Sequence, residues 1–478
     1  MTMINLFNNE KAPRKLGLYI HIPFCKTKCL YCDFCSFVSK DEAKREEYVS
    51  ALLREIEARG TKECLVDTIY FGGGTPSLLS VEQIDRILSR IRENFVVCED
   101  IEVTLECNPS TRKRDVEGAV PYGDCADSRV VEDVDPYGDD VCGTSKAPSP
   151  TGLRVHGVRP YDEGADLRVH GVRPYDEGAG LRVHGVPPYD EGADLRVVED
   201  VDPYGVGEYF EELRRIGVNR LSIGIQSAID GELKLIGRQH TFEEAKQTFF
   251  MARESGFDNI SIDLMFGIPS QTIESLKISL SEFISLGAEH ISIYSLQLEE
   301  GTPLYKMRDR YDLADDDSVA DMYEAVVSSM KEAGYSHYEI SNFAKVGKES
   351  RHNSKYWVLD EYLGLGLSAH SDFSGKRIEN TKDLQKYLLG DWIENEVEIP
   401  ITEREFEFIM LGLRTSRGIS KSEFFSRFGI DFDEKYGEKI EKLEKLGYFC
   451  ENGDFLALTE VGFEVSNCIL AQILDFDY

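Results

Sequence analysis

The chain has no run of 18 apolar residues, so we expect no segment to span a membrane. Its first residues, MTMINLFNNEKAPRK, lack the apolar stretch of a signal peptide. Basic residues are also few, because 54 Lys and Arg stand against 87 Asp and Glu, a formal net charge of −33. An acidic surface repels phosphate backbones, so we expect no nucleic-acid partner. The expected location is the reducing cytoplasm, where clustered cysteines are more often metal ligands or catalytic groups than disulfides.

Short apolar segments alternate with helical patterns six times along the chain. The expected strands are 17–22, 66–71, 101–106, 219–224, 259–266 and 290–296, and the expected helices are 42–59, 81–95, 207–216, 241–255, 272–287 and 317–333. Such alternation is typical of a parallel sheet covered by helices. Because the chain lacks a dinucleotide-binding glycine fingerprint, we expect an α/β open or partial barrel, with its chemistry at the C-terminal ends of the strands.

Residues 111–205 interrupt this alternation. Near-identical copies of LRVHGVRPYDEGAD begin at Leu153, Leu167 and Leu181, a strict period of 14 residues. The segment is rich in Gly, Pro and Asp and poor in large apolar residues other than Val. We therefore predict a low-complexity, disordered repeat insertion in preference to a short solenoid.

The remaining patterns divide the chain into domains. We predict a barrel from 1–110 and 206–345, a connecting segment over 346–400 and a small helical, winged-helix-like domain over 401–478. The last of these would ordinarily suggest DNA binding. It carries 16 acidic and 9 basic residues, which disfavours that role.

Four of the 11 cysteines lie within IHIPFCKTKCLYCDFCSF, residues 20–37. Such a density suits a disulfide staple, a zinc site, a redox pair or an iron–sulfur ligand set. Cys25, Cys29 and Cys32 form a C-x3-C-x2-C spacing that can ligate three irons of a 4Fe–4S cluster and leave the fourth iron open. Cys35 as a fourth ligand would instead close that site or complete a zinc site, and the alternative is a free thiol near the cluster.

Polar and glycine residues follow the other expected strands. GGGTPS at 72–77 removes side chains so that backbone can approach a ligand. Glu106, Gln226 and Asp263 lie at later strand ends, and Arg238 lies in KLIGRQHT. Each alone suits a cap or a surface position. Together at one barrel mouth they could hold an ammonium, a carboxylate and a ribose.

Taken together, these motifs resemble one family. HemW-type heme chaperones, radical-SAM relatives of the oxygen-independent coproporphyrinogen III oxidases, have segments similar to LYIHIPFCKTKCLYCDF, YFGGGTPSLL, VTLECNP, GVNRLSIGIQS, LIGRQHT, IDLMFGIPSQT, YEISNFA, RHNSKYW and YLGLGLSAHS. The resemblance covers 16–110 and 206–470. It implies a radical-SAM partial (β/α)6 barrel that uses a 4Fe–4S cluster and S-adenosylmethionine (SAM), with heme as cargo.

The resemblance also assigns site residues. It implies that Cys25, Cys29 and Cys32 hold the cluster. The residues that it implies for SAM binding are Tyr19, Gly73, Gly74, Thr75, Glu106, Gln226, Arg238 and Asp263. HNSKYW at 352–357 resembles the H-N-x-x-Y-W motif of the heme-chaperone branch, which implies heme contact by His352, Asn353, Tyr356 and Trp357. A core tryptophan beside a capping His-Asn pair is the alternative interpretation of this motif.

One position separates the branches of this family. The oxidases carry a fourth cysteine two residues after the third, where this chain has Phe34. This difference favours a chaperone that delivers heme to acceptors such as membrane respiratory cytochromes. The alternative is an oxidase that decarboxylates coproporphyrinogen III to protoporphyrinogen IX, so enzymatic activity is left open. The resemblance further suggests a cytoplasmic protein that touches the membrane peripherally during delivery, and it leaves a homodimer open.

Overall fold

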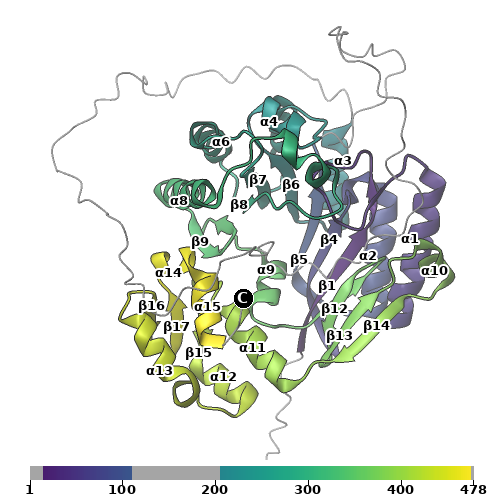
Figure 1. Cartoon of the computed structure of the whole chain (residues 1–478). Helices are drawn as coiled ribbons and strands as arrows, with labels where there is room; N and C mark the ends of the chain where they lie inside the picture. Colours follow the sequence, from purple (N-terminus) through teal and green to yellow (C-terminus); the bar gives the residue numbers. More distant parts are fainter. Residues whose placement is uncertain (1–13, 110–204, 475–478) are drawn as a thin grey trace, which may run out of the picture.

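The computed structural model describes residues 14–109 and 205–474. Its centre is formed by six parallel strands that lie side by side in chain order (Figure 1). These strands are β1 (Arg14–Ile22), β4 (Cys64–Gly73), β5 (Val96–Cys107), β6 (Arg220–Gln226), β7 (Ile260–Phe266) and β8 (His290–Ser295). The predicted open α/β barrel with six βα units is confirmed.

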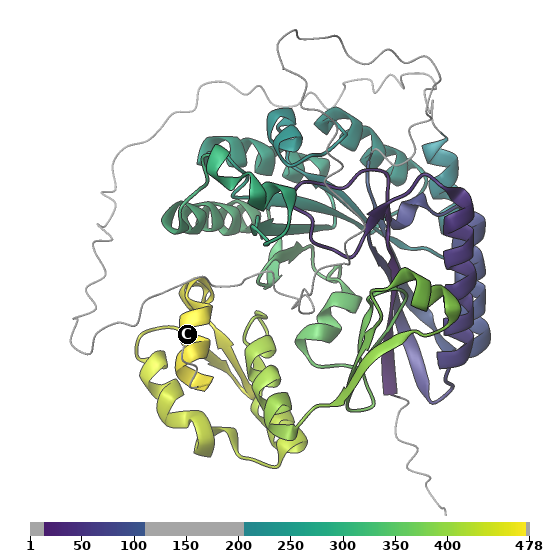
Figure 2. The same cartoon turned by 45° about the vertical axis from the view of Figure 1, so that its right-hand side comes forward.

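The helices between these strands cover the outer face of the sheet (Figure 2). They are α1 (Glu42–Arg59), α2 (Val81–Asn94), α3 (Val206–Ile216), α5 (Phe242–Glu254), α6 (Ile273–Leu286) and α8 (Asp316–Glu332). Ser80 and Thr241 begin α2 and α5 with capping boxes, which fix the helix starts. The outward side chains of β1, including Leu18 and Ile20, are fully buried beneath the helices.

Both edges of the sheet carry further strands, so that it has twelve in the described part of the chain. β11 (Tyr362–Leu365) pairs parallel to β1, and β12 (His370–Phe373), β13 (Lys376–Asn380) and β14 (Ile393–Glu398) continue antiparallel. At the other edge β10 (Asn342–Ala344) and β9 (Ser336–Glu339) follow β8. Much of the segment 346–400, which the sequence suggests as a connection, thus adds strands to the barrel sheet.

A buried carboxylate ties these added strands to α1. The Glu55 side chain is fully buried and accepts hydrogen bonds from Asn380 Nδ2 (2.7 Å), the Gly366 backbone N–H (2.8 Å) and the Tyr387 hydroxyl (2.7 Å). Arg59, one turn along α1, forms an ion pair with it at 3.0 Å. Tyr387 comes from the short helix α10 (Leu384–Leu389). Because each acceptor oxygen has its donors, this charge is compensated inside the fold.

The C-terminal residues form a separate small domain with its own hydrophobic core (Figures 1 and 2). A three-stranded sheet in the order β15–β17–β16 packs with five helices, which agrees with the expected winged-helix-like arrangement. Its elements are α11 (Ile401–Gly412), β15 (Ile419–Ser420), α12 (Lys421–Phe428), α13 (Phe432–Glu444), β16 (Phe449–Asn452), β17 (Phe455–Leu458), α14 (Glu460–Glu464) and α15 (Ser466–Leu474). Shorter elements elsewhere are β2 (Phe24–Cys25), β3 (Phe37–Val38), η1 (Pro76–Leu78), α4 (Asp230–Leu235), α7 (Pro303–Lys306) and η2 (Arg308–Arg310).

Helix α9 (Arg351–Trp357), which carries the HNSKYW motif, lies between the barrel and the C-terminal domain (Figure 2). Trp357 is buried in the hydrophobic core of the C-terminal domain. On the barrel side, Lys355 Nζ lies 2.7 Å from Asp67 Oδ1 of β4, and both side chains are less than one-tenth exposed. The helix therefore contacts both domains, with the apolar Trp357 side chain in one core and a buried ion pair to the other domain.

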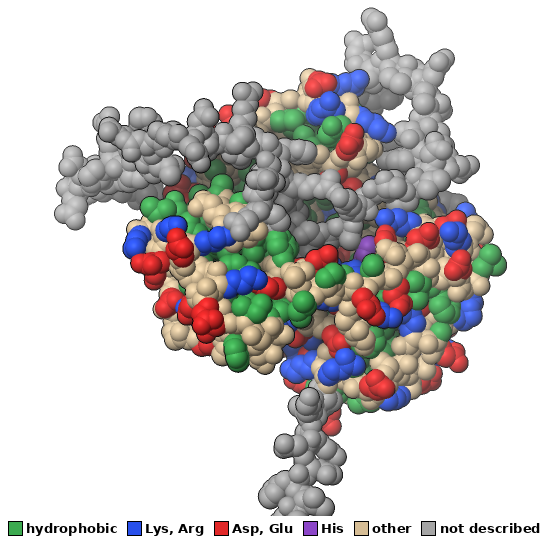
Figure 3. Space-filling view, turned by 60° about the horizontal axis from the view of Figure 1, so that its bottom comes forward, with side chains coloured by type: hydrophobic (Ala, Val, Ile, Leu, Met, Phe, Trp, Pro, Cys, Tyr) green, Lys and Arg blue, Asp and Glu red, His purple; other side chains and the backbone are tan. Residues whose placement is uncertain are grey.

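The surface of the described residues carries charges of both signs. On the face in Figure 3, Lys and Arg side chains are interspersed with Asp and Glu. None of the helices in the described ranges has the length and apolar content that crossing a bilayer requires. The predicted repeat insertion falls outside the described residues except for its last one, Gly205, which precedes α3.

The Lys355–Asp67 pair makes a stability prediction. Lys355→Met leaves the Asp67 carboxylate buried without its nearest cation, so we expect the free energy of unfolding to fall by about 3 kcal/mol in a urea titration. Adding Asp67→Asn removes the uncompensated charge and should recover most of the loss. Lys442→Met, which breaks the exposed pair with Glu438, is the matched control and should change stability by less than about 0.5 kcal/mol. Equal losses of stability in Lys355→Met and Lys442→Met would contradict the predicted contribution of the buried Lys355–Asp67 pair.

Candidate functional site

The predicted cluster cysteines lie in one loop at the C-terminal end of β1. The pairing of β2 with β3 closes this loop, because Phe24 lies opposite Phe37 and Cys25 opposite Val38. Cys25 ends β2 and is buried, whereas Cys29 and Cys32 are half-buried. The Cys32 N–H donates to the Cys29 carbonyl at 3.2 Å, which folds the loop back on itself. The structure therefore holds the three thiols on one compact turn.

Backbone contacts anchor this turn to the residue that follows α4 and to α7. The Leu30 N–H donates to the Ile236 carbonyl at 3.1 Å, and the Leu304 N–H donates to the Leu30 carbonyl at 2.9 Å. Gly237 adopts φ +78°, and a Cβ there would lie 2.9 Å from Leu30 Cγ. A side chain at Gly237 would displace the turn that carries the cysteines.

Two polar side chains donate to the cysteine sulfurs. Arg238 Nη1 lies 3.5 Å from Cys29 Sγ, and the Thr75 hydroxyl lies 3.6 Å from Cys25 Sγ. Burial, followed by the neighbouring Cys29, raises the pKa of Cys32 to about 12, and burial also raises the pKa of Cys25. These thiols are protonated at neutral pH, so metal binding must release their protons.

The fourth cysteine of the stretch contacts the hydrophobic core. Cys35 packs against the main hydrophobic core, where Tyr48 is one of its neighbours. Its carbonyl accepts a hydrogen bond from His21 Nε2 at 2.9 Å. Phe34, by contrast, is 53% exposed. Within the described ranges, no three His, Cys, Asp or Glu side chains are arranged to hold a single metal ion.

The glycine run, residues 72–74, places the end of β4 directly beside the cysteine loop. The Gly74 N–H donates to the Ile22 carbonyl at 2.8 Å, and the Thr75 N–H donates to the Phe24 carbonyl at 2.7 Å. A Cβ on Gly74 would lie 2.7 Å from the Phe24 carbonyl oxygen. Gly73 adopts φ +112°, a backbone conformation that residues other than glycine rarely adopt. The glycines are thus required for close packing of β4 against the residues before Cys25.

Glu106 lies next to the glycine run, at the end of β5. Its Oε1 accepts from the Tyr70 hydroxyl at 2.8 Å, and its Oε2 accepts from the Gly73 N–H at 3.2 Å. Burial raises the pKa of Glu106 to about 7, and the hydrogen bond from Tyr70 opposes that rise. The carboxylate is therefore held in a fixed orientation at the edge where the cysteine loop also lies.

The remaining predicted residues come from β1, β6 and β7. Asp263 Oδ1 accepts from the Ser222 hydroxyl at 3.1 Å, and burial raises the pKa of Asp263 to about 6. Gln226 has φ +81° and accepts from the Tyr294 hydroxyl at 2.8 Å. The Tyr19 hydroxyl lies 3.1 Å from His21 Nδ1. Seven of the eight predicted SAM residues lie on the inner face or at the C-terminal ends of β1 and β4–β7, or in the loop directly after β4, and Arg238 lies between α4 and α5.

The predicted heme residues divide between the two sides of α9. His352 is buried, and its Nδ1 lies 2.8 Å from the Thr68 hydroxyl while its Nε2 lies 3.0 Å from the Tyr356 hydroxyl. Burial lowers the pKa of His352 to about 3, so the imidazole is neutral. The Asn353 N–H donates to Ser350 Oγ, the helix cap. Trp357 packs into the C-terminal core, as in the core-tryptophan alternative.

Sequence reasoning identified Tyr19 but missed the polar residues that lie in line with it on the inner face of the neighbouring strands. Strand pairing places Tyr19 opposite Tyr70, Tyr70 opposite Thr104 and Thr104 opposite Arg220. Successive side chains of a strand point to opposite faces, so these four share one face. Period-two alternation within the expected strands was the signal that identifies them. The further inward residues missed are Thr68, Glu102, Ser222, Ser261, His290, Ser292 and Tyr294.

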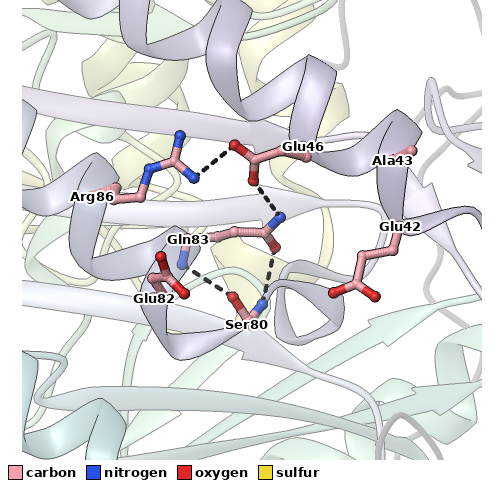
Figure 4. Close-up of a pocket in the computed structure, with 7 residues that line it drawn as sticks. All are labelled: Glu42, Ala43, Glu46, Ser80, Glu82, Gln83 and Arg86. Carbon is pink, nitrogen blue, oxygen red and sulfur yellow. Dashed lines mark hydrogen bonds and ion pairs between the residues drawn. The ribbon is translucent and has the colours of Figure 1, made fainter.

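A surface hollow of about 390 Å³ lies elsewhere, between the N-terminal ends of α1 and α2 (Figure 4). Its polar groups bond to one another: Glu46 accepts from Arg86 at 2.7 Å and from Gln83 Nε2 at 3.1 Å. None of the predicted site residues lines it. The hollow is therefore separate from the candidate site.

The donor set fits a cubane iron–sulfur cluster. Three thiols without disulfide partners lie on one turn, and Thr75 and Arg238 are positioned to donate hydrogen bonds to ligand sulfurs. Glu106, Asp263 and Gln226 supply acceptors along the same barrel edge. The arrangement can hold a cluster beside a small polar molecule that carries both amino and hydroxyl groups.

Two family models match the chain. The Radical SAM superfamily matches residues 19–144 and 181–282, and the HemN C-terminal domain matches residues 399–465. Among solved structures, the coproporphyrinogen III oxidase HemN from Escherichia coli superposes with a TM-score of 0.68 at 20% identity, and the match covers 97% of this chain and 91% of that one. This likeness supports the radical SAM barrel with its C-terminal domain.

Curated relatives match along almost their whole length. The Bacillus subtilis protein named heme chaperone HemW is 30% identical over 466 residues, covering 95% of this chain and 98% of that protein. The Escherichia coli protein of the same name is 28% identical over 469 residues, covering 96% and 98%. With its superfamily match and the cysteine loop described above, the chain belongs to the HemW family of radical SAM proteins.

Proposed function

We propose that this chain is a heme chaperone that binds a 4Fe–4S cluster, SAM and heme, and delivers heme to acceptors such as membrane respiratory cytochromes. The observation that carries the proposal is the separation of the cysteines into three plus one. Cys25, Cys29 and Cys32 share a turn with hydrogen-bond donors, while Cys35 packs against the core. The curated relatives named heme chaperone HemW support the same function.

In this proposal the cysteine loop holds the cluster through three thiolates. A bound cluster of this kind supplies one open iron and one-electron redox chemistry. Arg238 and Thr75 stabilise the negative sulfurs by donating to them. The backbone contacts of Leu30 and the close packing at Gly74 keep the loop in one position. These residues would thus orient the cysteine loop and stabilise the negative charge on the sulfurs.

SAM would lie along the adjacent barrel edge. Glu106 and Asp263 are acceptors for its amino group or its ribose hydroxyls, and the Tyr70 hydroxyl keeps Glu106 oriented. Gln226, held by Tyr294, adds an amide at the next strand end.

Heme would contact α9 through His352. Its neutral imidazole is the form that ligates iron, and the tautomer with Nδ1–H bonded to Thr68 would leave the Nε2 lone pair directed at the Tyr356 hydroxyl. Iron ligation would replace the hydrogen bond from Tyr356. Trp357 would support the helix from the C-terminal core, since it is buried there.

The first prediction concerns the cluster. After anaerobic reconstitution, Cys25→Ala, Cys29→Ala and Cys32→Ala should each lose most of the bound iron and sulfide, because each removes one of three ligands. Cys35→Ala is the matched control and should keep both at the level of the unmodified protein. Iron and sulfide analysis of all four variants measures this. Loss of the cluster in Cys35→Ala would show a four-cysteine site and refute the three-plus-one division.

The second prediction concerns heme. His352→Ala should weaken heme binding about tenfold or more in an anaerobic titration followed by the Soret band, because an iron ligand is lost. Tyr356→Phe is the matched variant: it removes only the hydroxyl that occupies Nε2, so affinity should stay equal or increase. Unchanged binding by His352→Ala would remove this residue from the heme site.

The third prediction separates delivery from porphyrin chemistry. With reconstituted protein, SAM and a reductant, we expect no conversion of coproporphyrinogen III to protoporphyrinogen IX, because the oxidases' fourth cysteine is replaced by Phe34. Chromatography of the porphyrins and of 5′-deoxyadenosine measures this. Loss of two carboxyl groups with release of 5′-deoxyadenosine would establish the oxidase activity and overturn the chaperone assignment.

A further inference from the structure

Arg220 is a buried cation on the inner face of the barrel. It is 2% exposed and is among the largest fully buried side chains of the described residues. Its position on β6 places it opposite Thr104 of β5, and both side chains point away from the helices. A guanidinium at this depth requires a partner, because burial removes the water that would otherwise solvate its charge.

No hydrogen bond or ion pair to this guanidinium is formed by the residues that the structure describes. Arg220 Nε is buried without a hydrogen bond, and the guanidinium forms no ion pair with a described carboxylate. The Thr104 hydroxyl beside it is buried and is likewise without a hydrogen bond. The Arg220 guanidinium and the Thr104 hydroxyl, on adjacent strands, are therefore both able to form further hydrogen bonds with one bound molecule.

Two acidic side chains of the same inner face, Glu102 and Asp263, accept hydrogen bonds from other residues. Glu102 accepts from the backbone N–H groups of Arg351 and His352 at 3.2 and 3.0 Å. Asp263 accepts from Ser222, and although Arg220 helps to lower its pKa, burial dominates and raises that pKa to about 6. Arg238, the other arginine of the site, already donates to Cys29 Sγ and to the Gly224 carbonyl. Arg220 is thus the uncommitted cation of the described inner face.

We propose that Arg220, with the Thr104 hydroxyl, forms a carboxylate-binding subsite for a molecule held inside the barrel. The planar guanidinium presents paired N–H donors that match the two oxygens of a carboxylate. The inference rests on the proposed function for the source of this group. That source is either the amino-acid carboxylate of SAM or a propionate of heme, and the chemistry recognised is the same.

The test uses the full chain, reconstituted anaerobically, and two pairs of probes that differ in the carboxylate. SAM is compared with its decarboxylated analogue by equilibrium dialysis, and heme is compared with its dimethyl ester by absorption titration. The unmodified protein should prefer the acid form in one pair by about tenfold or more. The pair that shows the preference identifies the source of the carboxylate.

Arg220→Gln should reduce that preference to near unity by weakening the acid form and leaving the decarboxylated or esterified form unchanged. Arg220→Lys keeps the charge but loses the paired donors, so it should keep an intermediate preference. Arg253→Gln is the control, since Arg253 pairs with Glu289. A variant that only damaged the fold would weaken the binding of both ligands of a pair equally.

Two results would overturn the subsite. The first is equal affinity of the unmodified protein for both members of each pair. That result would mean that Arg220 is solvated by water and binds no carboxylate, and its measurement requires no variant. The second is a preference that persists in Arg220→Gln. In either case binding of SAM and heme would still stand, so the proposed function survives. Failure to bind either ligand would overturn the proposed function and the subsite together.

Discussion

The alternation of apolar and polar side chains along six parallel strands is the constraint on which the rest of this structure depends. Successive residues of a strand point to opposite faces, so Leu18 and Ile69 lie under the helices while Tyr70 and Glu106 face inward. The outer face supplies the buried apolar area that stabilises the barrel. The parallel direction brings all strand C-termini to one edge, where the cysteine loop, the glycine run and Glu106 meet.

Helix α9 couples this barrel to the C-terminal domain. His352 and Lys355 reach β4 of the barrel, and Trp357 enters the core of the other domain. One short helix thus carries both a domain contact and the candidate heme ligand. A ligand that displaced Tyr356 from His352 would act on the element that joins the two domains. Binding at this helix and the relative position of the domains are therefore expected to be linked.

Local patterns predicted some parts of the molecule far better than others. The helix expected over 42–59 is α1 with the same bounds, because its apolar spacing and its Asp41 cap are local features. The strands β12–β14 were not expected, and every residue of β14 is exposed, so its sequence has no burial pattern to read. The resemblance predicts heme contact for Trp357 with a core position as the alternative, and the structure places its side chain in the C-terminal core.

The sequence by itself determined the six βα units, the three-cysteine spacing and the likeness to the HemW family, because periodicity, spacing and motif order are properties of the linear chain. Only the tertiary structure decided which polar residues of different strands lie opposite one another, that Cys35 packs against the core, and that Arg220 lies buried without a hydrogen bond or ion pair to a described residue. Those features depend on strand register and on contacts between residues far apart in the chain. No local pattern encodes such contacts, since they arise only when the strands pair.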